Sequence, residues 1–283
     1  MGQDRMTTLL GTLGSYQYVF HAYVGLLYLR VDICVGGRET TSLLAQNLFK
    51  IMTFPYSVNP QMIIEEDHER DIRHLLGGLT YLIYVIPDRH LVRALLEFWD
   101  PVRMVFKFVD FDLVPMIEEI SGFIKLPYHE CEMMVPYKPS SREFLKCLGM
   151  KSNLTITCLD VGWISFDFLY SRFGQEDGYY SFYEEFECSI ERWETYRLKA
   201  FAIALLGSLV LPKESGKIDT RLGYVVQDLA QREGEPRKTI VPMIMAEMMR
   251  NLSACINGTI FSEGCNLLLQ LWVLNTSTGD LTR

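Results

Sequence analysis

Hydrophobic residues recur at helical spacing along most of the chain. In residues 66–86, Ile72, Leu75, Leu76 and Leu79 follow the i, i+3, i+4 spacing of an amphipathic helix, with charged residues in the first turns. Proline, glycine and capping residues separate similar patterns elsewhere. These signals predict helices over 16–30, 40–52, 66–86, from Leu91 to Trp99-Asp100-Pro101, from Asp112 to Leu126-Pro127, and over 140–149, 160–173, 181–211, 221–232, 240–256 and 259–274. We therefore expect a mainly α-helical fold, a multi-helix globular domain.

The segment 104–139 departs from the helical pattern. Phe106 and Phe108 lie on one side of an extended segment and Lys107 on the other, which is typical of a short strand. Two prolines in residues 128–139 favour a hairpin or a loop over a helix. The sequence therefore predicts one or two short strands or a hairpin within 104–139.

The helix between these extended segments carries several terminal signals. Asp112 is suited to cap it, Pro115 fits its first turn, and Glu118-Glu119 lie near its positive end. Leu126-Pro127 ends it, because a residue that precedes proline avoids the helical conformation.

Two other segments have ambiguous patterns. Residues 181–211 exceed the length of an ordinary globular helix, so we expect a kink or break in them, after their acidic half. Residues 152–159 alternate threonine with apolar residues and fit either a strand or a loop.

Composition and charge narrow the functional classes. The 283 residues include 27 basic and 35 acidic ones, a net charge of −8, which disfavours a broad phosphate-binding surface. No apolar run reaches the ~20 residues of a bilayer-spanning helix, so we predict no membrane contact. The N-terminus lacks a secretory signal, and the seven cysteines are scattered without a CxxC motif, which indicates a cytosolic or nuclear protein that is not secreted.

Candidate catalytic and metal-binding residues do not form a recognisable pattern. His68 and His74 would point to different sides of a helix, and His129-Glu130-Cys131 are adjacent residues that rarely converge on one ion. The chain has neither a GxSxG nucleophile motif nor a glycine-rich phosphate-binding motif. We therefore predict no catalytic, metal-binding or cofactor-binding residues and no enzymatic activity.

The most biased stretch is 173–196, which combines aromatic residues with glutamates. Aromatic rings beside carboxylates are suited to a basic partner, and the same carboxylates repel nucleic acid. The alternative interpretation is an ordinary amphipathic helix with aromatic core contacts and a solvated acidic face. The candidate interaction face consists of Tyr179, Tyr180, Tyr183, Glu184, Glu185 and Glu187.

Residues 91–274 contain, in this order, Trp99-Asp100-Pro101, Phe106-x-Phe108, Asp112-Leu113-Val114-Pro115, Glu118-Glu119-Ile120 and Leu126-Pro127. Together these motifs resemble the plant mobile domain family, a transposon-associated family also labelled aminotransferase-like, and related plant domains of unknown function. Two positions depart from the family pattern, since Met116 stands in place of a common threonine and Lys125 in place of a glycine. Further similarity lies in Pro139-Ser140, the helix from Trp193 to Pro212 and Leu269-x-Leu271-Trp272. The motif residues are Trp99, Asp100, Pro101, Phe106, Phe108, Asp112, Pro115, Glu118, Glu119, Leu126, Pro127 and Trp272.

The resemblance implies three parts: a helical N-terminal extension in residues 1–90, a plant-mobile-domain-like helical domain in 91–274 and a polar tail in 275–283. Because domains of that family continue past the Leu-x-Leu-Trp motif, it also implies a shortened domain. It supplies no established catalytic residue. The label aminotransferase-like would require a Schiff-base lysine, for which Lys199 in its apolar helix is the candidate, and the alternative is an ordinary helix lysine that reaches solvent.

The function expected from the resemblance is a non-enzymatic protein-interaction module of transposon origin, with a nuclear role in silencing or genome maintenance. A protein partner is expected, and the location is nuclear, or cytoplasmic if no partner carries the chain to the nucleus. A nucleic-acid-binding remnant of a mobile element and an enzyme with a cryptic site are the alternatives.

Overall fold

The computed structural model describes residues 64–85, 89–134, 141–151, 162–174, 178–212, 217–230, 236–257 and 265–278. Its helices are α3 (Ile64–Leu76), the 3-10 helix η1 (Gly77–Tyr84), α4 (Arg89–Leu96), α5 (Ile117–Ile124), α6 (Ser141–Cys147), α7 (Phe166–Leu169), the π-helical turn η3 (Tyr170–Gly174), α8 (Gly178–Phe186), α9 (Ile190–Leu205), the π-helical turn η4 (Leu206–Val210), α10 (Leu222–Leu229), α11 (Val241–Ile256) and α12 (Asn266–Thr278). The strands are β1 (Trp99–Asp100), β2 (Val105–Lys107), β3 (Asp112–Leu113), β4 (Glu132–Met133), β5 (Trp163–Ser165), β6 (Lys217–Asp219) and β7 (Lys238–Thr239). The helices predicted over 16–30 and 40–52 and the ambiguous segment 152–159 lie outside the described residues.

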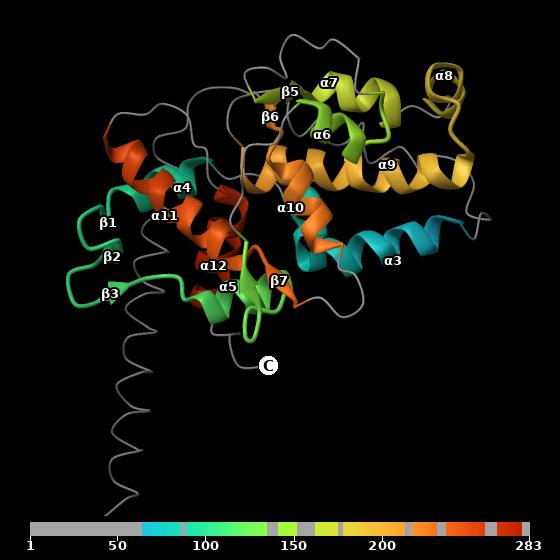
Figure 1. The fold of residues 1–283 in the computed structure, drawn as a ribbon. Helices are drawn as coiled ribbons and strands as arrows, with labels where there is room; N and C mark the ends of the chain where they lie inside the picture. The colour runs from blue at the N-terminus through green and yellow to red at the C-terminus, as the bar shows by residue number, and fades with distance from the viewer. Residues whose placement is uncertain are drawn as a thin grey trace, which may run out of the picture.

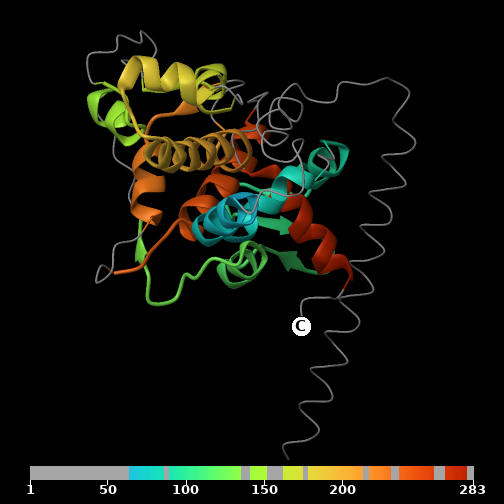
Figure 2. The same cartoon turned by 90° about the vertical axis from the view of Figure 1, so that its right-hand side faces the viewer.

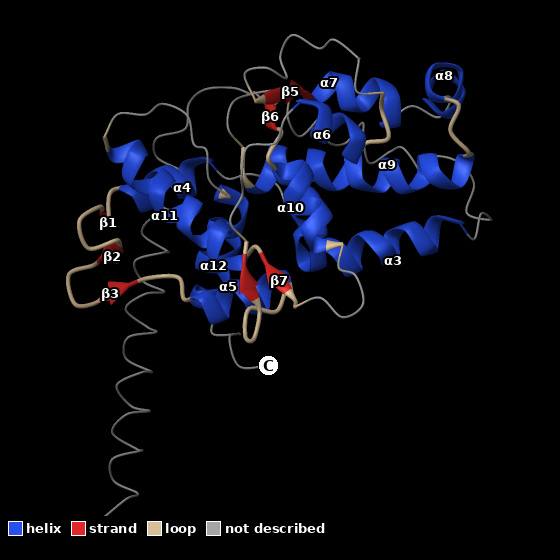
Figure 3. Cartoon of the chain, in the orientation of Figure 1, coloured by secondary structure: helices blue, strands red, loops and turns tan. Residues whose placement is uncertain are grey.

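The mainly α-helical prediction is confirmed, since the described strands are two or three residues long and form small sheets beside the helices (Figure 3). Helix α9 crosses one half of the molecule, with α6 and α7 on one side and α3 on the other (Figures 1 and 2). Helices α4, α5, α11 and α12 form the other half, and the sheet β1–β2–β3 lies at its outer edge. None of the described helices is long and apolar enough to span a bilayer.

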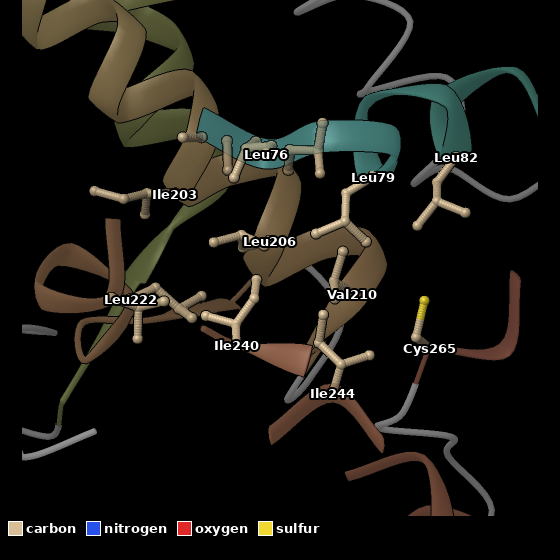
Figure 4. Close-up of a cluster of buried hydrophobic side chains, with 14 of the residues drawn as sticks. Leu76, Leu79, Leu82, Ile203, Leu206, Val210, Leu222, Ile240, Ile244 and Cys265 are labelled. Atoms are coloured by element: carbon tan, nitrogen blue, oxygen red, sulfur yellow. The ribbon is translucent and has the colours of Figure 1, made fainter. Parts of the chain in front are cut away.

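One continuous hydrophobic core joins these helices. Leu79 of η1, Leu206 of η4 and Ile244 of α11 are fully buried and converge in Figure 4. Burying a side chain of this size contributes roughly 1.5–3 kcal/mol relative to leaving it in water. Residues 64–85, within the predicted N-terminal extension, thus supply part of this core.

The helix predicted over 66–86 changes geometry at Gly77. The predicted helix is present as α3 and η1, but it tightens into the 3-10 helix η1 at Gly77, which has a φ of +54°. A Cβ at Gly77 would lie 2.4 Å from the carbonyl oxygen of Ile124, and one at Gly78 would lie 2.7 Å from that of Phe123. The glycine pair therefore lets η1 approach the C-terminal end of α5 at backbone contact.

The extended segment around Phe106 forms the middle strand of an antiparallel sheet in the order β1–β2–β3. As predicted, Phe106 and Phe108 are buried and Lys107 is exposed. The predicted roles of Asp112 as the cap of α5 and of Pro115 in its first turn are both wrong. Asp112 belongs to β3 and forms a 2.7 Å ion pair with Arg103, and α5 begins only after Met116.

The remaining strands pair with distant parts of the chain. β4 lies in the segment predicted as a hairpin or loop, and it pairs in parallel with β7, more than a hundred residues later. β5 pairs with β6, so the predicted helix over 160–173 is wrong at Trp163–Ser165. Helix α7 starts directly after β5, where the Ser165 hydroxyl accepts a 3.2 Å hydrogen bond from the Phe168 N–H.

The predicted break in residues 181–211 is confirmed, but its predicted place after the acidic half is wrong, because the break lies among the glutamates. Helix α8 ends at Phe186 and α9 begins at Ile190. Glu187 adopts the left-handed conformation, with a φ of +53°, and its N–H donates a 2.8 Å hydrogen bond to the Tyr183 carbonyl. The chain therefore turns immediately after the exposed acidic positions of α8.

The later helices follow the predictions closely, since α10 and α11 fall within 221–232 and 240–256. The last helix extends further than predicted: Asn275–Thr278, expected in the polar tail, belong to α12. Their side chains bond to the preceding turn, because Asn275 and Thr276 donate to the carbonyls of Leu271 and Trp272 at 3.0 and 2.8 Å. Residues 279–283 lie outside the described residues.

Candidate protein-interaction surface

Helix α8 divides its aromatic residues between two faces. Tyr179, Phe182 and Phe186 recur at i, i+3, i+7 and pack inward. Phe182 is fully buried, with its ring centroid 5.4 Å from that of Phe173 and 4.6 Å from that of Phe186. The inner face thus anchors α8 to the turn η3 and to α9.

The outer face of α8 carries two tyrosines and one glutamate, and a second glutamate follows in the turn after the helix. Tyr180, Tyr183 and Glu184 follow the spacing i, i+3, i+4, which places them on one side of α8, and Glu187 is the first residue beyond its end. Tyr180 is 70% exposed and Tyr183 is 52% exposed, and both glutamates are exposed. We call these four residues the α8 outer face.

Tyr179 connects the outer face to the core. Its ring centroid lies 5.8 Å from that of Tyr180, 6.0 Å from that of Tyr183 and 5.7 Å from that of Trp193. Its hydroxyl donates a 3.4 Å hydrogen bond to the Cys188 carbonyl, beyond the turn. Partial removal from water raises the pKa of Tyr179, so its hydroxyl remains a donor at neutral pH.

Two arginines beside α8 show how this part of the molecule holds cations. The Arg172 guanidinium, on η3, lies 4.0 Å above the Phe168 ring and 4.0 Å from a Glu185 carboxylate oxygen. The Arg197 guanidinium, on α9, lies 5.1 Å from the Trp193 ring centroid and 3.5 Å from Glu194. In each case a planar cation contacts both an aromatic face and a carboxylate.

The structure therefore brings together the six predicted interaction residues on one helix and its C-terminal turn, but it divides their roles. Tyr180, Tyr183, Glu184 and Glu187 face solvent, Tyr179 packs inward, and Glu185 faces Arg172. The sequence reasoning missed Arg172 and Arg197. Each arginine follows its aromatic partner by four residues, a spacing that signals contact on a helix.

The family-motif residues gather elsewhere, in the interior. The Trp99 ring packs edge-on against Phe106 at 4.9 Å, and the Phe106 ring stacks on Trp272 at 5.9 Å. The Trp99 indole donates a 3.0 Å hydrogen bond to the Ser253 hydroxyl, and the Trp272 indole donates a 2.9 Å hydrogen bond to Glu119. These motif residues therefore join β1, β2, α5 and α12.

The other motif residues shape turns or lie at the surface. The Asp100 carboxylate accepts hydrogen bonds from the backbone N–H groups of Arg103 and Val102, and these bonds lower the pKa of Asp100. Phe108 stacks between Phe98 and Phe111, at 4.8 and 4.9 Å. Pro115 and Leu126 are buried, Pro101 is half-buried, and Asp112, Glu118 and Pro127 are exposed.

The structure describes some of the candidate metal and cofactor residues, and these make local contacts of their own. No group of three His, Cys, Asp or Glu side chains in the described segments is arranged to hold a metal ion. The Cys131 thiol contacts the His129 carbonyl, and His74 is exposed on α3. The side chain of His68 lies outside the described residues, and the Lys199 ammonium lies 5.9 Å from the Tyr196 ring centroid.

Comparison with known proteins identifies one family. The model of a family described as a domain of unknown function (DUF7745) matches residues 60–280. No curated protein and no solved structure matches the chain. The resemblance to the plant mobile domain family stays a prediction.

Proposed function

The chain belongs to the DUF7745 family, and we propose that it is a non-enzymatic protein-interaction module whose contact surface is the α8 outer face. The observation that carries the proposal is the 70% and 52% exposure of Tyr180 and Tyr183 beside the exposed Glu184 and Glu187. Tyrosine is enriched in protein interfaces, because its ring supplies a large contact area and its hydroxyl remains solvated.

The partner chemistry follows from charge. Residues 178–191 contain four glutamates and no lysine, arginine or histidine, within a chain of net charge −8. A basic segment of a protein gains from this field, whereas the phosphates of a nucleic acid would be repelled. We therefore propose a partner protein that contributes a lysine- or arginine-containing segment.

The cellular role that we propose rests on the motif resemblance. From this resemblance we propose that the chain is a transposon-derived plant protein with a nuclear role in silencing or genome maintenance.

Photocrosslinking tests the proposal. A crosslinking amino acid replaces Ser181, an exposed residue of α8, in the full chain, and a second variant carries it at Glu130. In plant nuclear extract, the crosslink from position 181 should map to a lysine- or arginine-rich segment of one partner, because the carboxylates beside it attract cations. The added changes Glu184→Gln and Glu187→Gln should reduce this crosslink severalfold.

Two results would contradict the proposal. One is a crosslinked segment without basic residues. The other is a crosslink from position 181 that persists in the glutamine variant or that matches the one from position 130.

A further inference from the structure

The α8 outer face has the chemical features of two cation sites that the protein already fills with its own arginines. Arg172 lies on Phe168 and reaches Glu185, and Arg197 lies on Trp193 and reaches Glu194. On the outer face the rings are Tyr180 and Tyr183, and the carboxylates are Glu184 and Glu187. Each glutamate follows its tyrosine by four residues.

No lysine or arginine of the described segments contacts these two rings or these two carboxylates. Tyr180 and Tyr183 contact only Tyr179 among the described rings, and neither Glu184 nor Glu187 forms an ion pair with a described residue. The Arg172 guanidinium lies 4.0 Å from a carboxylate oxygen of Glu185, on the adjacent side of α8, while Glu184 and Glu187 are exposed to solvent.

We propose that the α8 outer face recognises an arginine side chain in the basic segment of the partner. The guanidinium lies against the Tyr180 and Tyr183 rings and forms hydrogen-bonded ion pairs with Glu184 and Glu187. This inference rests on the proposed function and adds the identity of the recognised side chain.

Arginine fits these features better than lysine. A guanidinium is planar, stacks on aromatic rings and presents several N–H groups, so that it contacts a ring and two carboxylates together. An ammonium group is a compact, strongly hydrated charge that gains less from the rings. The two internal sites next to α8 both hold arginine.

Rigidity of the surface supports recognition of a single side chain. Phe182 is fully buried beneath the face, and the Glu187 N–H is bonded to the Tyr183 carbonyl at 2.8 Å. The backbone that carries the tyrosines is therefore fixed before binding, which lowers the entropic cost of association.

The test measures binding of the full chain to three short fluorescent Gly/Ser peptides. They differ only in carrying several arginines, the same number of lysines, or the same number of citrullines, which keep the planar shape without the charge. At about 100 mM salt we expect the arginine peptide to bind at least about threefold more tightly than the lysine peptide, since cation–π contacts are worth about two- to fivefold each. The citrulline peptide should bind most weakly.

Matched variants locate the site. Tyr180→Ala with Tyr183→Ala should weaken arginine-peptide binding about tenfold and remove the preference over lysine, whereas Tyr180→Phe should keep both. Glu184→Gln with Glu187→Gln should weaken binding of both basic peptides.

Control variants make the same changes elsewhere. Glu130→Gln with Glu132→Gln removes the same charge beside β7, away from α8, and should have little effect on binding (Figure 1). Tyr81→Ala removes another exposed tyrosine as a control, and circular dichroism verifies the folding of each variant.

The possible failures are distinguishable. Equal arginine and lysine binding that both depend on Glu184 and Glu187 would overturn arginine recognition and leave the basic-partner proposal in place. Equal weakening by the two glutamine pairs would show attraction by net charge and overturn the site. Absence of binding up to about 1 mM peptide would overturn the arginine inference, while the crosslink from position 181 independently decides the proposed function.

Discussion

The Trp272 indole donates a hydrogen bond to the Glu119 carboxylate, with 2.9 Å between Nε1 and Oε2. The same carboxylate oxygen accepts the Met116 backbone N–H at 2.9 Å and so caps the first turn of α5. Two motif residues separated by 153 positions therefore meet in one contact, which ties the start of α5 to α12. The cap by itself is a local contact within α5, and the hydrogen bond from the indole adds a contact between α5 and α12.

Removal of the indole N–H should destabilise the protein while the cap persists. Trp272→Phe should lower the free energy of unfolding by about 1.5–3 kcal/mol, because a hydrogen bond to a charged group is lost in the interior. Trp272→Ala should cost about 3–5 kcal/mol, since it also leaves a cavity against Phe106. Urea unfolding followed by circular dichroism measures both, and equal stability of Trp272→Phe and the parent would contradict the assigned role.

Two glycine substitutions should have opposite effects. Gly77→Ala combines a left-handed backbone with a Cβ placed 2.4 Å from a carbonyl oxygen, so it should destabilise by more than about 1 kcal/mol. A Cβ at Gly122, inside α5, meets no atom within 4 Å, and Gly122→Ala should stabilise by about 0.5–1 kcal/mol. Thermal unfolding of the two variants checks the sign, and a stabilising Gly77→Ala would show that η1 does not require this backbone conformation.

The two faces of α8 should respond differently to truncation. Phe182→Ala should cost about 3–5 kcal/mol, because it empties a fully buried position between η3 and α9. Tyr180→Ala removes an exposed ring and should change the free energy of unfolding by no more than about 0.5 kcal/mol. Urea unfolding measures both, and a large stability loss from Tyr180→Ala would assign the tyrosine to folding instead of binding.

Cys265 should make stability fall in alkaline solution. Complete burial raises the pKa of its thiol to about 12, whereas in the unfolded chain the thiol ionises near pH 8.5. Between these values the unfolded state releases a proton that the folded state retains, so unfolding becomes easier as the pH rises, by up to about 1.4 kcal/mol per pH unit. Below about pH 8 the contribution is fully present.

The measurement compares the parent with Cys265→Ala in guanidinium unfolding at pH 7 and about pH 10. The variant loses some stability at both pH values because a buried atom is removed, and it should show a smaller decrease between them. A parallel decrease in both proteins would indicate that other groups account for the alkaline loss.

Local patterns predicted much of the fold. Helical spacing of apolar residues identified α10 and α11, and the alternation around Lys107 identified β2. These predictions succeed because the order of apolar and polar residues along a short segment shows which face of the element is buried. The break between α8 and α9 was predicted from length alone.

The errors have a common physical origin in long-range contacts. Asp112 has the chemistry of a helix cap, but pairing with β2 and the ion pair to Arg103 place it in a strand. The local sequence of Trp163–Ser165 is compatible with a helix, but antiparallel pairing with Lys217–Asp219 makes the segment a strand. Likewise, Gly77 tightens the helix because the end of α5 is adjacent.

The amino-acid sequence by itself determined the composition of the candidate surface: the tyrosines and glutamates of residues 179–187, their spacing and the absence of basic residues from 178–191. Only the tertiary structure decided which of them face solvent. Tyr179 packs on Trp193 while Tyr180 and Tyr183 remain exposed, and Arg172 approaches Glu185 from a separate turn. The physical reason is that the residue spacing defines the two faces of α8, whereas the elements that pack against the helix determine which face is buried.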